Sequence, residues 1–411
     1  MLMPSGRIAS YSPERREQMA DKFQADLREA RDTKDSVITC DCDREKQLRL
    51  YTRPVAGSDR LALRRYPNTG PLHAADCQYY ERVNRDGGAR TYSAACIRED
   101  EEGELHISLR YPLKVRDNIA DDQSGELLPP RQQRAGARQA SMSFLGLLHL
   151  LWENTQRNIW YPWFEGRRDL KNLMYALYNE ATKIKQGRTR LSRVLMLQGE
   201  TTRNQEAFTH ASQSHSRLVL ISELSGWTAE KETGTGLLPV VLGKPAPFLN
   251  MDVNRWQNTL TRFPHARAWW RAGGKVIAIA VTDVPDDGPQ YRRATVRQVC
   301  LMMVSDRWIP LDSAFEGEVE NKLVAEGRAF IKPLLFDSAE DEYLPDFILS
   351  DTANGCCPME VWGMETEHYL AHKAGKTAWY DQEYEEDWWG WDAAARAAMP
   401  DFPPTVRYRA Q

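Results

Sequence analysis

Hydrophobic and polar positions follow two different periods along the chain. Near the N-terminus, apolar residues recur every fourth position at Met19, Phe23 and Leu27, which is the spacing of one helical face. Residues 141–197 hold two further apolar faces with helical spacing. Residues 218–299 instead contain short, dense apolar runs such as KVIAIAVTDV, which favour buried strands. The pattern predicts a chain of mixed α and β elements.

The most informative pattern covers residues 313–384. It predicts a helix, two short strands separated by an Asn-Gly turn signal, and a second helix. In the second helix, Tyr369, Lys373, Lys376 and Tyr380 lie four, three and four positions apart. This spacing places all four side chains on one helical face.

Acidic residues interrupt these apolar elements. Glu316 lies on the expected helix, Asp346 within the first strand and Glu360 at the start of the second. Glu320, one turn after Glu316, is placed to face the same region. Most acids are ordinary solvated charges, but Asp is depleted within strands. Converging carboxylates suit a hard divalent cation, which activates water and stabilises charge on a phosphodiester.

This order of features resembles the PD-(D/E)XK nuclease superfamily. The resemblance rests on a helix with Glu, the letters PDF, an apolar strand with Glu and a Tyr/Lys helix, all within residues 313–384. It implies that Glu316, Asp346 and Glu360 are catalytic acids. It also implies that Asp346 and Glu360 bind magnesium or manganese.

One position departs from the family pattern. Where the lysine of the family would follow the strand glutamate by two positions, this chain has Trp362. Some members carry the lysine on the next helix, which nominates Lys373 or Lys376 as catalytic. Two interpretations stay open, because a shared architecture does not guarantee shared chemistry. The chain is either a metal-dependent endonuclease acting on DNA or a catalytically inactive nuclease-fold protein that binds DNA or serves as a scaffold.

Two pairs of metal-binding residue types lie near the N-terminus. Cys40 and Cys42 form one pair, and His73 and Cys77 form the other. Three thiolates and one imidazole complete the tetrahedral shell of a structural zinc site, and expected strands between the pairs suggest a zinc-ribbon-like module. Buried thiols without a metal are the alternative. Cys96 is either a substitute ligand or a core residue.

A basic segment follows the two expected helices of the middle region. No acidic residue occurs from Thr182 to Gln198. The basic residues of this segment are Lys183, Lys185, Arg188, Arg190 and Arg193. Two helices with a basic turn are typical of helix-turn-helix or winged-helix folds, whose cations contact DNA phosphates. A solvated helix end, where cations favour the helix dipole, is the alternative interpretation.

Together these patterns predict a multidomain chain of α+β or α/β class. Residues 1–114 form an N-terminal helix and the zinc-binding β module, and residues 115–140 form a polar linker. Residues 141–210 form a helical, winged-helix-like module suited to DNA. Residues 211–411 form a PD-(D/E)XK-like mixed sheet flanked by helices, with a Trp-rich tail. The strands at 218–299 either extend this sheet or form a domain beside it.

Composition narrows the location and the partners. The net charge of −4 gives no global basic field, so any DNA contact depends on local patches. The polar N-terminus does not fit a signal peptide, and no apolar run reaches the ~18 residues of a membrane span. Seven cysteines, with Cys356 and Cys357 adjacent, do not fit a disulfide framework. These features predict a cytoplasmic protein without membrane contact.

The two ends of the chain resemble one family when they are taken together. The CxC and HxxxC pairs, a Trp-rich middle and the letters MEVWGM near the C-terminus resemble a bacterial family, domain of unknown function 1173. That family is carried on plasmids and integrative elements. The resemblance implies a role in plasmid transfer or defence, with DNA and protein components of such a system as partners.

Overall fold

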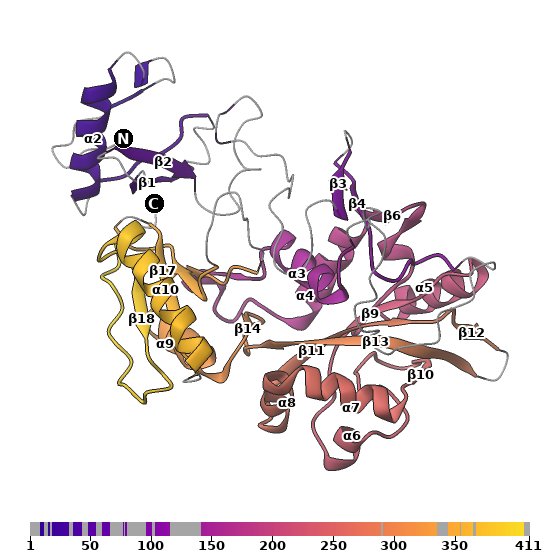
Figure 1. Cartoon of the computed structure of the whole chain (residues 1–411). Helices are drawn as coiled ribbons and strands as arrows, with labels where there is room; N and C mark the ends of the chain where they lie inside the picture. Colours follow the sequence, from indigo (N-terminus) through magenta and orange to yellow (C-terminus); the bar gives the residue numbers. More distant parts are fainter. Residues whose placement is uncertain are drawn as a thin grey trace, which may run out of the picture.

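The computed structural model combines helices with several β-sheets, as predicted (Figure 1). It describes residues 9–11, 15–16, 19–32, 36–42, 48–54, 60–65, 77, 79, 96–100, 103–115, 141–288, 291–334, 344–353, 355–364 and 367–406. His73 and residues 116–140 of the expected linker therefore lie outside the described residues. Within the described parts, no helix has both the length and the apolar character needed to cross a membrane.

A seven-stranded sheet forms the middle of the structure. Its main path follows the order β10 (Phe248–Asn250), β13 (Arg292–Val304), β11 (Lys275–Thr282), β9 (Val219–Glu223) and β8 (Leu195–Leu197). Two short strands, β12 (Asp286–Asp287) and β14 (Pro310–Leu311), also pair with β13. The parallel neighbours β8 and β9 are joined through helix α5 (Thr201–Gln213), as parallel strands require a crossover.

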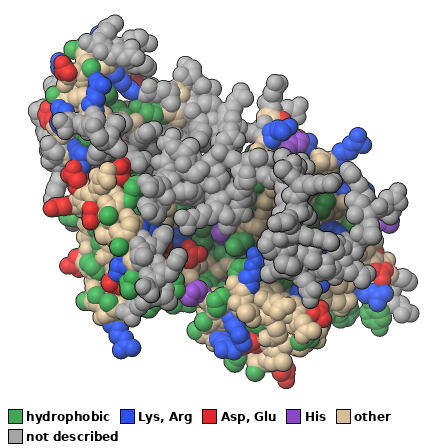
Figure 2. All heavy atoms as spheres, in the orientation of Figure 1, with side chains coloured by type: hydrophobic (Ala, Val, Ile, Leu, Met, Phe, Trp, Pro, Cys, Tyr) green, Lys and Arg blue, Asp and Glu red, His purple; other side chains and the backbone are tan. Residues whose placement is uncertain are grey.

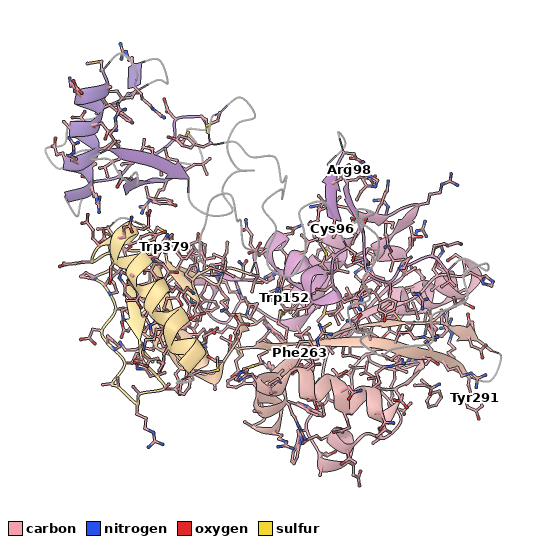
Figure 3. The ribbon with its side chains drawn as sticks, in the orientation of Figure 1. Cys96, Arg98, Trp152, Phe263, Tyr291 and Trp379 are labelled. Carbon is pink, nitrogen blue, oxygen red and sulfur yellow. The ribbon has the colours of Figure 1, made fainter. Side chains whose placement is uncertain are left out.

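Helices cover both faces of this sheet (Figure 1). One face carries α3 (Phe144–Asn154) and α4 (Leu170–Ala181), and the other carries α6 (Ala229–Thr233), α7 (Val253–Arg262) and α8 (Pro264–Arg271). Burial on both faces explains why β11 is apolar from Val276 to Val281. Trp152 of α3 lies in the packed interior and donates from Nε1 to the carbonyl of Trp308, whereas Tyr291 lies at the far end of the sheet (Figure 3).

A second, five-stranded sheet contains the C-terminal pattern. Its order is β18 (Trp389–Trp391), β17 (Cys357–Val361), β16 (Phe347–Leu349), β15 (Phe330–Ile331) and β5 (Ile159–Trp160). Helix α9 (Ala314–Ala325) precedes β15, and helix α10 (Glu367–Tyr384) connects the parallel strands β17 and β18. The sequence predicted two of these strands together with both helices. The other strands were missed because they are short or come from distant parts of the chain.

The two sheets share one hydrophobic core. The strands expected at 218–299 form the separate seven-stranded sheet, not an extension of the C-terminal one. However, β5 pairs with β15, and β8 pairs with β9. These pairs cross the boundary expected at residue 210, and one cluster of buried side chains extends from residue 96 to residue 402. The middle region therefore supplies structural parts to both sheets.

The N-terminal elements have a small core of their own. Helix α2 (Ala20–Asp32) confirms the first helical prediction, and its Phe23 and Leu27 pack against β1 (Leu50–Pro54) and β2 (Leu61–Arg65). Tyr51 of β1 also packs on the outer face of the five-stranded sheet. A four-stranded sheet joins the first hundred residues to the middle region through β3 (Ile97–Glu99), β4 (Leu105–Ile107), β6 (Ile184–Gln186) and β7 (Thr189–Arg190). Short 3₁₀ turns, η3 (Pro162–Phe164) and η4 (Leu191–Arg193), complete the middle region.

A buried ion pair fastens the C-terminal sheet to the segment after β18. Arg328 and Asp351 are 3% and 2% exposed, and Arg328 Nη2 lies 2.8 Å from Asp351 Oδ1. Asp351 also accepts from the amide of Ala329 at 2.9 Å, and its own carbonyl accepts from the amide of Val406. Asp351 therefore supplies hydrogen-bond acceptors to Arg328 and to two backbone amides, and removing its carboxylate leaves Arg328 and the amide of Ala329 without that partner.

We expect Asp351→Ala to lower the free energy of unfolding by about 3–5 kcal/mol, because it leaves Arg328 buried without its counter-ion. The matched control is Glu326→Ala, which removes the exposed partner of Lys322 and should cost less than about 1 kcal/mol. Urea unfolding of both variants measures the difference. Equal effects would show that the buried pair has no special structural role.

Candidate active site

Three elements, α9, β16 and β17, carry the predicted acids toward one region of the C-terminal sheet. Ser313 caps α9 by accepting from the amide of Glu316 at 3.1 Å, which fixes Glu316 in the first helical turn. Asp346 lies directly before β16, where its amide donates to the carbonyl of Met359 at 3.0 Å. Glu360 lies in β17 on the neighbouring strand. The β16–β17 register therefore places Asp346 beside Glu360, as the sequence indicated.

Helix α10 supplies a lysine and a tyrosine to Glu360. Lys376 Nζ lies 2.7 Å from Glu360 Oε1 and also donates to the carbonyl of Leu344 at 2.9 Å. Tyr380, one helical turn later, donates its hydroxyl to the same Glu360 oxygen at 2.7 Å. Glu360 and Lys376 are 2% and 8% exposed, so this contact is shielded from water. Of the two nominated lysines, Lys376 contacts the acid site.

The other nominated lysine points elsewhere. Lys373 forms an ion pair with Asp392, at 2.6 Å. Its ammonium and that of Lys376 lie 5.6 and 5.9 Å from the ring centre of Trp362. Trp362 is 5% exposed and packs beneath both lysines. The ring of Trp362 therefore packs against the same helix, α10, whose Lys376 contacts Glu360.

A second lysine, which the sequence reading missed, neutralises Glu316. Lys332 follows β15 and is 2% exposed. Its Nζ donates to Glu316 Oε2 and to Asp312 Oδ2, both at 2.8 Å. The same Glu316 oxygen accepts from the amide of Asp312 at 3.0 Å. The available signal was a lysine directly after the apolar letters AFI, but the two-residue strand was too short to recognise.

Glu320 does not join this site. It is fully buried one turn after Glu316, but it accepts from Ser305 Oγ at 3.2 Å and from Arg307 Nη1 at 3.1 Å. The expectation that Glu320 faces the same place as Glu316 is therefore wrong. The loop between β13 and β14 captures the Glu320 side chain.

The negative charges of the site outnumber its positive ones. Glu316 and Glu360 are buried, Asp346 is half-buried and Asp312 is exposed. Four carboxylates, those of Asp312, Glu316, Asp346 and Glu360, share the ammonium groups of two lysines. Asp346 accepts from the amide of Val361 at 2.7 Å, but among the described residues it has no cationic nitrogen within 4.0 Å. If all four carboxylates are ionised, the site carries a net charge of −2, and among the described residues Asp346 is the acid that lacks a cationic partner.

The pKa values of the three acids Glu316, Asp346 and Glu360 are all raised. Burial, followed by the charge of Asp346, raises the pKa of Glu360 to about 8. Burial also raises the pKa of Glu316 to about 8, and it raises that of Asp346. His149 of α3 lies within electrostatic range, but burial lowers its pKa to about 4, so its imidazole is neutral near pH 7. Protonation or a divalent cation would relieve the excess negative charge.

The donor set fits a hard divalent cation. Each acid uses one oxygen within the protein: Oε2 of Glu316, Oδ2 of Asp346 and Oε1 of Glu360. The other oxygen of each accepts no hydrogen bond from the described residues. Magnesium takes oxygen ligands and keeps several waters, so it does not need all three acids in direct contact. In the described parts of the chain, the three acids do not form a group with donor atoms all within 4.8 Å.

The predicted zinc ligands are partly described. Cys40, Cys42 and Cys77 have their sulfur atoms within 4.8 Å of one another, with Cys40 and Cys77 at 3.4 Å. Zinc–sulfur bonds of about 2.3 Å place thiolates about 3.8 Å apart in a tetrahedral shell, so the three sulfurs fit zinc. His73, the predicted fourth ligand, lies outside the described residues. Cys96 is instead a core residue, 2% exposed.

The structure also contains an acidic group that the sequence reading did not single out. Asp100, Glu104 and His106 lie within 4.8 Å of one another. Protein partners already engage them: His106 Nε2 lies 2.8 Å from Asp100 Oδ2, and Arg190 Nη2 lies 2.6 Å from Glu104 Oε1. We treat this group as an ion-pair network.

The basic segment is largely neutralised by acids. Lys183 pairs with Glu180 at 2.9 Å, and Lys185 and Arg190 both pair with Glu104. The two remaining cations are exposed: Arg188 and Arg193. On the face shown in Figure 2, the Lys and Arg side chains of the described residues are dispersed and do not gather into one large basic patch. Any contact with DNA phosphates by this segment depends mainly on these two arginines.

We expect the purified full-length protein to contain about one zinc ion and Cys42→Ser to lose most of it, because three thiolates dominate the affinity. Cys96→Ala is the matched control and should retain the zinc, since Cys96 belongs to the core. Elemental analysis by mass spectrometry measures the stoichiometry. Equal zinc in both variants, or none in the parent, would contradict the assignment.

We expect the free energy of unfolding to fall as the pH rises from about 4.5 to about 8. The folded pKa of Glu360 lies above its ordinary value of 4.5, so the folded state binds the proton more tightly. This stabilisation is complete below the unfolded pKa and is lost as the pH rises through the folded one, at up to about 1.4 kcal/mol per pH unit.

Urea unfolding between pH 5 and 9 tests this dependence. Glu360→Gln should flatten the slope, whereas Glu326→Gln on the surface of the C-terminal half should leave it unchanged. The account is contradicted if the parent and Glu360→Gln show the same slope. Millimolar magnesium should raise the parent's melting temperature more at pH 8.5 than at pH 6, because ionised carboxylates bind it better.

Comparison with known proteins identifies the family. A family model described as a protein of unknown function (DUF1173) matches residues 11–394. No curated protein and no solved structure matches the chain. The matched range contains the three-cysteine group, both sheets and the acid site. The family predicted from the two ends of the chain is thereby confirmed, and the protein belongs to the DUF1173 family.

Proposed function

We propose that the protein is a metal-dependent endonuclease acting on DNA. The observation that carries this proposal is the meeting of Glu316, Asp346 and Glu360, from three separate elements, in a buried site with unbalanced negative charge. The order α9, β15, β16, β17, α10 and β18 also follows the order of features that resembles the PD-(D/E)XK nucleases. An association with plasmid transfer or defence belongs to the same proposal.

The site residues have separate tasks in this proposal. Asp346 and Glu360 would hold magnesium or manganese, and Glu316 would contribute the third acid. The bound ion supplies Lewis acidity and a lowered pKa for its water. Lys376 orients Glu360 through their 2.7 Å contact and carries positive charge to the place where the scissile phosphate would lie. Tyr380, which is 1% exposed, donates to the same glutamate oxygen and holds it in place.

The zinc group has a structural task. Three cysteines and His73 would fill all four positions of the ion, so no position is open for catalysis. Zinc would instead fold the N-terminal module, whose own core is small. Because Tyr51 of this module packs on the sheet that carries the acids, zinc also supports that sheet from outside.

A second candidate function is a catalytically inactive DNA-binding or scaffold protein. Trp362 at the family's lysine position favours it, together with the fact that Lys332 and Lys376 are both engaged by acids. In that case Arg188 and Arg193 would contact DNA phosphates, and binding would weaken steeply with salt.

We expect purified protein to cut plasmid or single-stranded DNA with magnesium or manganese. Asp346→Ala should lower cleavage by at least about 100-fold, since even residues that only support metal ligands contribute 10- to 100-fold. Lys376→Ala should lower it by about 10- to 100-fold for that reason. Lys373→Ala is the matched control and should stay within about twofold, because Lys373 pairs with Asp392 outside the site.

The outcomes separate the two candidate functions. Cleavage by the parent that Asp346→Ala leaves undiminished would exclude this site as the catalytic centre. No cleavage by folded parent, with DNA binding that weakens in salt, would favour the inactive DNA-binding protein. Loss of that binding in an Arg188→Ala/Arg193→Ala variant would then locate the contact.

A further inference from the structure

Lys332 is a buried cation that faces three carboxylates. Its ammonium lies 2.8 Å from both Glu316 Oε2 and Asp312 Oδ2, and the charge of Asp346 also acts on it. Hydrogen bonds to two carboxylate oxygens at 2.8 Å favour the charged ammonium form of Lys332. Its positive charge offsets part of the negative electrostatic potential that would attract a divalent cation.

The backbone around Lys332 is held firmly, whereas its side chain has partners on two sides. The Lys332 amide donates to the carbonyl of Asn158 at 2.8 Å, and Asn158 Nδ2 donates to the Lys332 carbonyl at 2.9 Å. The side chain of Glu316 is 5% exposed, but that of Asp312 is 76% exposed. The ammonium thus links an interior carboxylate to a surface one. A flexible lysine stem allows it to favour either partner while the backbone stays fixed.

Lys332 and a bound metal ion would share Glu316. Lys332 donates to Oε2 of Glu316, and Oε1 of the same carboxylate accepts no hydrogen bond from the described residues. Two cations so close to one carboxylate repel each other, and the interaction is weakly screened because Glu316 and Lys332 are both buried. Asp312, by contrast, is exposed and is not needed by the metal.

We propose that Lys332 competes with the divalent cation for Glu316 and thereby sets how tightly the site binds metal. This inference rests on the proposed function, because it requires the acid site to bind a divalent cation. Lys332 then acts as a positioning residue: it keeps Glu316 in place in the metal-free protein and yields it when metal enters. When Lys332 releases Glu316, it keeps its hydrogen bond to Asp312.

Manganese binding to the full-length protein tests the competition without relying on cleavage. Electron paramagnetic resonance of free Mn²⁺ at pH 8 gives the affinity of the parent and of Lys332→Met. Removing the ammonium should tighten Mn²⁺ binding by at least about tenfold, because a cation within a few ångströms opposes the metal strongly at a protein-like dielectric. Lys332→Arg, which keeps the charge, is the matched control and should give no gain.

A second background distinguishes competition for Glu316 from a general change of charge. In Glu316→Gln, the Lys332→Met substitution should change Mn²⁺ affinity by less than about twofold, because the shared carboxylate is gone. A gain that persists undiminished in this background overturns the inference. Circular dichroism checks folding, and Lys332→Gln serves as a polar alternative that should shift the affinity in the same direction.

The remaining outcomes separate this inference from the proposed function. If the parent binds Mn²⁺ and the folded Lys332→Met and Lys332→Gln proteins bind it equally or more weakly, the competition is overturned while the metal site stands. If neither the parent nor these variants bind Mn²⁺, the metal site is overturned, and the inference with it.

Discussion

The arrangement of the C-terminal half depends on keeping several carboxylates away from water. Each buried ion costs several kcal/mol unless it is paired and hydrogen-bonded. The chain meets this cost for Glu316 with Lys332 and for Glu360 with Lys376 and Tyr380. These partners come from different elements, so α9, the end of β15, β17 and α10 must keep one relative arrangement. Replacing such pairs with apolar residues is often neutral or stabilising, so their presence supports the proposal that this site has a function.

The acid site also depends on parts of the chain that lie far away in sequence. Asn158 exchanges hydrogen bonds with the backbone of Lys332, and Glu153 of α3 accepts from the amide of Leu334 at 3.0 Å. Strand β5 extends the five-stranded sheet, while α3 packs on the seven-stranded one. The middle region is therefore the support that joins the two sheets. Because Glu153 of α3 accepts from the amide of Leu334, a movement of α3 would displace the segment that contains Lys332.

The sequence predicted the three acids because each lies within or beside an apolar element and because their order resembles that of the PD-(D/E)XK nucleases. It did not distinguish Lys373 from Lys376, since both lie on one face of α10 and the choice depends on how the helix is rotated above Trp362. It missed Lys332 because a two-residue strand leaves no periodicity. Strand β5 and its pairing with β15 were also beyond reach, because long-range pairing has no local signature. Glu320 was misplaced because its partner Arg307 belongs to a loop between strands.

The central claim is that the negative charge shared by Glu316, Asp346 and Glu360 exists to bind a divalent cation. Anomalous diffraction from crystals soaked in manganese tests it most directly. The account predicts a manganese peak bound by Asp346 and Glu360, with Lys332 withdrawn from Glu316. At saturating manganese, the absence of a peak at these acids, with the pairs of Lys332 and Lys376 unchanged, would contradict it.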